Sequence, residues 1–181
     1  MAHIDGGARG NPGPAGYGVV IEDEVGRPVV ELSNFLGKQT NNFAEYSGLL
    51  AALTYATRYG FKALKVYSDS ELMVKQINGQ YKVNNAALKE LHAKATRMIE
   101  DLEAFEINHV LREKNREADW LANRAMDLGT KAQAETDAQK SAPLAAPTVN
   151  EVSGIVRNGV VEFLGPKLAD GTPVTIRAAK L

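Results

Sequence analysis

Three short runs of apolar residues follow one another in the first 40 residues, and each is typical of a β-strand. The turn between the second and third runs contains Glu24, Gly26 and Pro28, which favour a chain reversal. The three runs are AHID, AGYGVVIED and PVVELSNFLG. This part of the chain is therefore predicted to form a three-stranded meander.

The spacing of apolar residues changes at residues 40–60 to the period of an amphipathic helix. Tyr46, Leu49 and Leu53 share one stripe, and Gly60 marks the helix end. A strand, two helices, a strand and a helix are predicted to follow, with the sequences ALKVYS, SELMVKQING, NAALKELHAKATRMIEDL, FEINHVL and NREADWLANRAMDLG. Three strands followed by alternating strands and helices predict an α/β layer fold, a mixed sheet covered by helices.

The composition of the chain changes after the last of these helices. Residues 130–150 are rich in Ala, Gln, Thr, Ser and Pro and have no apolar period, which predicts a flexible linker. Two apolar runs then flank Asn158 and Gly159, a strong signal of a β-hairpin, and TPVTIRAA is expected to form a third strand. The predicted organisation is a main domain, a linker and a small β-hairpin domain, at residues 1–129, 130–150 and 151–181.

Composition and charge narrow the class of protein. The 181 residues are 44% hydrophobic and 24% charged, which is typical of a soluble globular protein. Cysteine is absent, which excludes disulfides, thiolate metal sites and a cysteine nucleophile. We find neither a secretion signal nor a membrane-spanning run, so the expected location is the cytoplasm, with no membrane partner. The formal net charge of −1 argues against nucleic-acid binding through excess positive charge alone, and leaves metal-assisted binding open.

Four acidic residues, Asp5, Glu45, Asp69 and Asp119, lie at the ends of predicted elements or inside a predicted strand. Taken singly, Glu45 and Asp69 are explained by helix capping, and Asp119 by the dipole at a helix start. Taken together, the four are expected to face the core side of their elements. Clustered carboxylates repel one another unless cations bind, so the pattern predicts a metal site, with Mg²⁺ as the expected ion.

Four segments in order resemble the motifs of type 1 ribonuclease H: IDGGARGNPGPAGYG, TNNFAEYSGLLAAL, VYSDSELMVKQI and NREADWLANRA. The resemblance covers residues 1–129. It implies a ribonuclease H-like five-stranded mixed sheet with the first three strands antiparallel and helices on both faces. It also implies an endoribonuclease that hydrolyses the RNA strand of RNA–DNA hybrids, leaving 5′-phosphate and 3′-hydroxyl ends.

The same resemblance identifies Asp5, Glu45, Asp69 and Asp119 as the catalytic and metal-binding tetrad. By the family pattern, Asp5 and Asp119 hold the ion that carries the attacking water. Asp5, Glu45 and Asp69 hold a second ion near the leaving oxygen. Two Mg²⁺ ions are the implied cofactor, and Mn²⁺ is an alternative.

Substrate-binding residues are also implied by the resemblance. Asn11, Asn42 and Glu45 match positions that contact the sugar edges of the hybrid, and Thr40 matches one that seats a DNA phosphate. Gly6 is expected to leave room for the nucleic-acid backbone. Asn11 as a turn residue and Asn42 as a helix cap remain alternatives.

Two features depart from the best-known bacterial pattern. Few residues separate SELMVKQING from NAALKELHAK, so the basic protruding handle found in many members is absent. Arg112 stands where many members carry a histidine, and because arginine does not act as a general base, we expect it to position phosphate or speed product release. His109 is interpreted mainly as part of a strand, with a catalytic role as the alternative.

The last 31 residues resemble the short β units of small antitoxin proteins, which predicts a homodimer through strand edges. A surface hairpin without a partner is the alternative. Two other functions also remain open for the main domain. One is a junction resolvase or transposase-like nuclease that uses Asp5 and Asp69, and the other is a non-catalytic hybrid-binding regulator.

Overall fold

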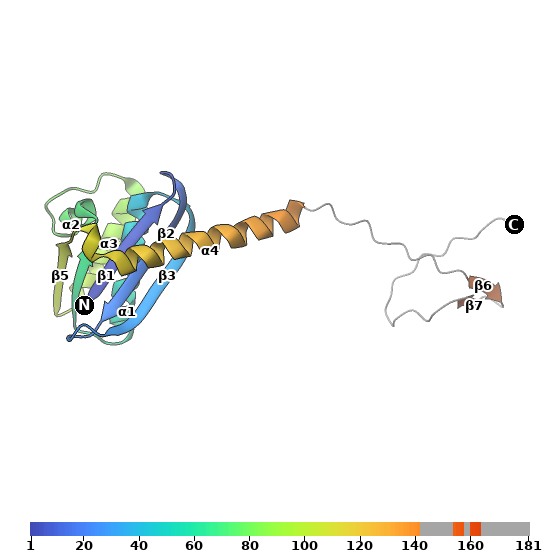
Figure 1. The fold of residues 1–181 in the computed structure, drawn as a ribbon, viewed down its shortest axis with the longest axis horizontal. Helices are drawn as coiled ribbons and strands as arrows, with labels where there is room; N and C mark the ends of the chain where they lie inside the picture. Colours follow the sequence, from blue (N-terminus) through green and yellow to red (C-terminus); the bar gives the residue numbers. More distant parts are fainter. Residues whose placement is uncertain (142–153, 158–159, 164–181) are drawn as a thin grey trace. The chain divides into compact units, whose positions relative to one another are not determined.

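A computed structural model describes residues 1–141, 154–157 and 160–163, which divide between two units, Met1–Lys140 and Ser141–Leu181. The first unit is built on a mixed sheet with strand order β3-β2-β1-β4-β5 (Figure 1). β1 pairs antiparallel with β2, as the predicted meander requires, and parallel with β4, as the predicted mixed sheet requires. The strands are β1 Ala2–Ala8, β2 Gly13–Glu22, β3 Pro28–Gln39, β4 Ala63–Ser68 and β5 Ala104–His109.

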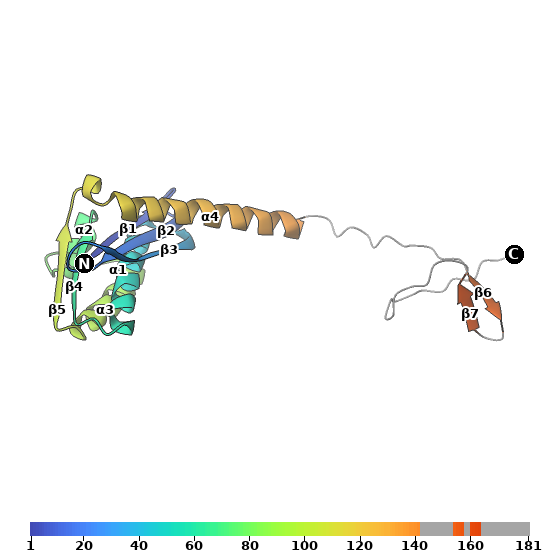
Figure 2. The ribbon, with the colours of Figure 1, turned by 60° about the horizontal axis from the view of Figure 1, so that its bottom comes forward.

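Helices cover both faces of this sheet, which confirms the predicted fold class. Figure 2 shows α4 along one face and α1 with α3 against the other. The helical elements are α1 Asn41–Arg58, α2 Glu71–Ile77, α3 Ala86–Glu100, the short 3-10 helix η1 Arg112–Lys114 and α4 Arg116–Ser141. Each helix expected from the apolar spacing is therefore present.

The hydrophobic core lies between the sheet and α1. Ile4 and Val66 from neighbouring strands and Leu49 and Leu53 from α1 are fully buried there. Burying an aliphatic side chain of this size contributes about 1.5–3 kcal/mol. The stripe of α1 that the sequence pattern marked as apolar is thus the surface that holds the helix on the sheet.

Two glycines allow the helices to approach the sheet closely. A Cβ atom at Gly6 of β1 would lie 2.2 Å from the backbone of Ala44 and Glu45 in α1. A Cβ atom at Gly18 of β2 would lie 2.2 Å from the carbonyl oxygen of Ala118 in α4. We expected Gly6 to leave room for nucleic acid, but α1 fills that space, because the helix packs directly on the strand backbone.

The last helix is longer than the sequence pattern predicted. α4 runs to Ser141, twelve residues beyond Gly129, so residues 130–141 are helical where a flexible linker was expected. Eight of the twelve residues in TKAQAETDAQKS are Ala, Gln, Lys or Glu, which are strong helix formers even without an apolar period.

In the second unit, β6 Gly154–Arg157 and β7 Val160–Phe163 pair antiparallel with Arg157 opposite Val160, which confirms the predicted hairpin. The expected third strand, TPVTIRAA, lies outside the described residues. Among the helices described, none combines the length and the apolar character needed to cross a membrane.

Candidate active site

Three carboxylates from separate parts of the chain converge where the pairing of β1 with β4 ends. Asp5 comes from β1, Glu45 from the first turns of α1, and Asp69 directly follows β4. One carboxylate oxygen from each residue lies within 4.8 Å of the chosen oxygen of the other two. The side chains of Asp5 and Glu45 are buried, with only 6% and 4% of their surfaces exposed. The structure thus brings together three of the four predicted acids in one compact group.

The local fold explains why these three residues meet. Ile4 and Ser68 are the last partners in the parallel pairing of β1 with β4. Asp5 follows Ile4 and stays in the sheet, paired with Gly18 of β2, while Asp69 directly follows the end of β4, so the two residues lie side by side. The absence of a side chain at Gly6 lets α1 approach β1, and this approach brings Glu45 to the same place.

The electrostatics of the group raise the pKa values of Asp5 and Glu45 in the absence of a cation. Burial, together with the nearby charge of Asp69, raises the pKa of Asp5 to about 7. Burial and the charges of Asp5 and Asp69 raise the pKa of Glu45 well above its ordinary value, against a smaller lowering by the Gly6 N–H. A divalent cation would remove this repulsion and favour the ionised form of each group.

Two oxygen atoms of the group have no hydrogen-bond partner among the described residues: Oε2 of Glu45 and Oδ1 of Asp69, both fully buried. Buried carboxylate oxygens without donors are costly, and hard oxygen donors are the ligands that Mg²⁺ and Mn²⁺ prefer. The residues present therefore fit a divalent metal ion.

Asp119 lies apart from the compact group but lines the same cavity, which has a volume of about 380 Å³. Its carboxylate accepts a hydrogen bond from the guanidinium of Arg112, with which it forms an ion pair. The buried side chain of Asn115 donates to the carbonyl oxygen of Ile4 over 2.8 Å and so ties the start of α4 to β1 beside Asp5. Arg112 and Asp119 thus reach the cavity as a pair.

The capping alternatives for two of the acids are wrong. The N-cap of α2 is Ser70, which makes no side-chain cap bond, and its N–H donates to the Ser68 hydroxyl rather than to Asp69. Glu45 is buried in the carboxylate group instead of facing the helix start. His109 ends β5 as an exposed residue and does not line the cavity.

The predicted substrate-binding residues gather at the start of α1. Thr40, not Asn42, is the N-cap, and its hydroxyl accepts from the N–H of Phe43 at 3.3 Å. Asn42 is half-buried one residue inside the helix. Asn11 Oδ1 accepts from the N–H of Asn41 at 3.2 Å, so this side chain joins the β1–β2 turn to α1.

Sequence reasoning missed Asn41. Its Oδ1 accepts from the N–H of Ala8 at 3.2 Å, and the residue lines the cavity together with Arg9 and Asn123. The only signal for Asn41 in the sequence was the pair of adjacent asparagines in TNNF, of which the family resemblance indicated Asn42. Which of two adjacent asparagines faces a cavity depends on where the helix begins, and that is decided by the cap at Thr40.

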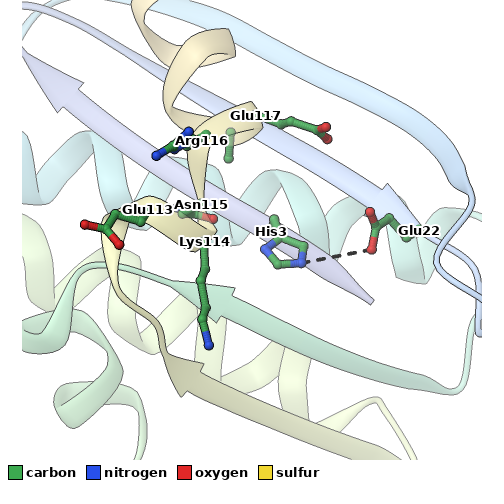
Figure 3. Close-up of a pocket in the computed structure, with 8 residues that line it drawn as sticks. His3, Glu22, Glu113, Lys114, Asn115, Arg116 and Glu117 are labelled. Carbon is green, nitrogen blue, oxygen red and sulfur yellow. Dashed lines mark ion pairs between the residues drawn. The ribbon is translucent and has the colours of Figure 1, made fainter.

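A second cavity, of about 300 Å³, lies beside His3 and Glu22 and is lined on its other side by residues 113–118. Figure 3 shows Glu113 and Glu117 pointing away from each other, and marks the ion pair between His3 Nε2 and Glu22 Oε2 at 4.0 Å. Because its carboxylates diverge, this cavity lacks the metal-binding character of the first.

Residues 3–125 match the family described as reverse transcriptase-like. The chain is 40% identical over 126 residues to ribonuclease HI of Halobacterium salinarum, which is 70% of this chain and 63% of that protein. It is 39% identical over 150 residues to a bifunctional protein of Mycobacterium tuberculosis, 82% of this chain and 41% of that protein. The chain thus spans less than two thirds of the length of either relative.

Solved structures of ribonuclease H proteins are also similar to this chain. The N-terminal ribonuclease H domain of a M. tuberculosis protein has a TM-score of 0.70 at 38% identity, covering 73% of this chain and 96% of the domain. The H. salinarum ribonuclease H1 has a TM-score of 0.67 at 40% identity, with 70% and 96% covered. A ribonuclease H1 in complex with an RNA/DNA hybrid has a TM-score of 0.67 at 44% identity, with 71% and 97% covered.

Proposed function

This chain belongs to the type 1 ribonuclease H family, and from that premise we propose that it hydrolyses the RNA strand of RNA–DNA hybrids. The observation that carries the proposal is the compact group of Asp5, Glu45 and Asp69 with its unpartnered buried oxygens. A solved relative at 44% identity is bound to such a hybrid. The expected cytoplasmic location stays a prediction.

The chain's own residues divide the work as follows. Asp5, Glu45 and Asp69 would hold one Mg²⁺ ion, and Asp5 with Asp119 would hold a second. Divalent ions held there would supply charge stabilisation at phosphorus and a more acidic water, and the expected products carry 5′-phosphate and 3′-hydroxyl ends. Arg112 forms an ion pair with Asp119 and lines the cavity, which supports a role in contacting a phosphate of the hybrid.

The start of α1 is the proposed contact surface for the hybrid. The N-terminus of a helix presents free N–H groups and a partial positive charge, which suit a phosphate near Thr40. Asn11 and Asn42 lie within the same region and are proposed to contact the sugar edges, where the 2′-hydroxyl distinguishes RNA from DNA. Gly6 contributes through the position of α1 rather than through open space.

Cleavage of a labelled RNA–DNA hybrid tests this function, beside RNA–RNA, DNA–DNA and four-way-junction DNA controls, with Mg²⁺ and then with chelator. We expect cutting of the RNA strand in the hybrid alone, lost with chelator and in Asp69→Asn. The matched control is Asp101→Asn, an exposed carboxyl at the end of α3, which keeps full activity. Junction cleavage would favour a resolvase, and a folded wild type that binds hybrid without cutting it would favour a regulator.

We further propose that the C-terminal unit forms a homodimer through the β6–β7 hairpin. Two strands of four residues do not form a stable sheet alone in water, and pairing with the hairpin of a second copy would supply further strands. Sedimentation of the full chain and of a chain ending at Ser141 tests this. A monomer mass for the full chain at all concentrations would refute the dimer.

A further inference from the structure

The outward face of α4 carries a tryptophan that the proposed catalytic group does not use. Trp120 directly follows Asp119 in the chain and is the only tryptophan of the protein. Its side chain is 56% exposed, although tryptophan is largely buried in most proteins. Its ring makes a cation–π contact with Arg124, whose guanidinium carbon lies 5.1 Å from the ring centroid.

Arginines flank this tryptophan on the same helix face. Arg116, Trp120 and Arg124 are spaced four residues apart, so they form one stripe about 12 Å long. Within the part of the chain that the structure describes, neither Arg116 nor Arg124 forms an ion pair with a carboxylate. Figure 3 shows Arg116 and the neighbouring Glu117 pointing to opposite sides of the helix start. The stripe therefore presents two arginines without a direct ion pair around an aromatic ring, with Glu117 and the Arg9-paired Asp127 as the acidic residues nearest to it on the helix.

The stripe lies on α4 next to the residues that line the catalytic cavity, although its first residue, Arg116, lines the second cavity. Asp119 and Asn123 line that cavity, and Trp120 is rotated about 100° from Asp119 around the helix. A nucleic-acid strand that leaves the cavity over α4 would meet Trp120 within one helical turn. Positive charge around an accessible ring suits a polyanion that carries planar bases.

We propose that Arg116, Trp120 and Arg124 bind single-stranded nucleic acid that flanks the hybrid, an inference that rests on the proposed function. Bases inside a duplex are stacked on one another and offer no free face to an indole ring. Unpaired bases stack on exposed aromatic side chains, and the flanking arginines contact the phosphates. The stripe would then select hybrids with a single-stranded extension.

Fluorescence gives a test that requires no cleavage, because the signal of the protein's single tryptophan reports on Trp120 alone. Titration with an oligothymidylate of about ten nucleotides at low salt is expected to quench the emission. Arg124→Ala should weaken this binding severalfold. Arg58→Ala, which removes an exposed arginine at the end of α1, should leave it unchanged. Absence of quenching, or an equal loss in Arg58→Ala, would overturn the proposal.

Cleavage kinetics then separate this proposal from the proposed function. In Trp120→Ala, KM for a hybrid with a single-stranded extension is expected to rise about tenfold, the loss of one base–aromatic stack. KM for the blunt hybrid should stay within about twofold. An equal rise in KM on both substrates would refute the proposed binding by the stripe while leaving the ribonuclease function intact. Failure of the wild type to cut either substrate would refute the proposed ribonuclease function. The fluorescence quenching would in that case still show whether the stripe binds single-stranded nucleic acid.

Discussion

The substitution Gly6→Ala tests whether the contact between β1 and α1 holds the catalytic group together. The added Cβ atom would lie 2.2 Å from the carbonyl carbon of Ala44 and from the nitrogen of Glu45. Both atoms belong to the backbone, so no side-chain rotation relieves the clash. Helix α1 must move away from the strand by more than 1 Å to reach ordinary contact, about 3.4 Å.

The cost of this movement follows from what α1 buries. The helix carries Leu49 and Leu53, both fully buried against the sheet, so moving it opens part of the core. Overpacking that displaces backbone typically costs about 1–3 kcal/mol in the free energy of unfolding, and because no side chain can yield here we expect a loss of about 3 kcal/mol. For a unit of this size, that loss lowers the melting temperature by roughly 6–12 °C. Because Glu45 moves with the helix, we also expect Mg²⁺ to stabilise the variant less than the wild type.

Gly7→Ala is the matched control. Its Cβ atom would contact only the terminal methyl group of Met126 at 3.3 Å, and this flexible end can shift. We expect a change below about 1 kcal/mol there. Thermal and urea unfolding followed by circular dichroism, with and without Mg²⁺, measure both variants. Equal stability of Gly6→Ala and Gly7→Ala would refute the argument that the close approach of α1 requires a glycine.

Three other changes test separate parts of the site. The folded-state pKa of Asp5 is raised to about 7, so the metal-free protein should lose stability as pH rises through 7. The midpoint of urea unfolding in chelator should therefore be higher at pH 5 than at pH 8. This difference between the two midpoints should be smaller in Asp5→Asn. Arg112→Ala removes an exposed ion pair and should change the free energy of unfolding by less than about 1 kcal/mol. Its kcat on hybrids should fall roughly a hundredfold. An unchanged kcat would contradict the proposed role of Arg112. Thr40→Ala removes the N-cap of α1 and should cost about 1 kcal/mol in urea unfolding, more than Asn42→Ala.

Much of the fold follows from local patterns in the sequence. The apolar stripe through Tyr46, Leu49 and Leu53 predicted α1, because one face of a helix must be apolar to pack on a sheet. The Asn158–Gly159 pair predicted the β6–β7 hairpin, since these residues favour the turn between short strands. The end of α4 was missed because residues 130–141 form helix by intrinsic propensity, which leaves no apolar period to detect.

The candidate site, like the fold, was predicted only in part from the sequence. The sequence by itself determined the four acids, through motifs whose order and residues could be compared with a known family. Only the tertiary structure decided that Asp5, Glu45 and Asp69 form the compact group while Asp119 pairs with Arg112. It also decided that helix α1 occupies the space beside Gly6 and that the side chain of Trp120 is exposed. Motifs specify which chemical groups are present, whereas distances between residues far apart in the chain depend on how the helices and strands pack.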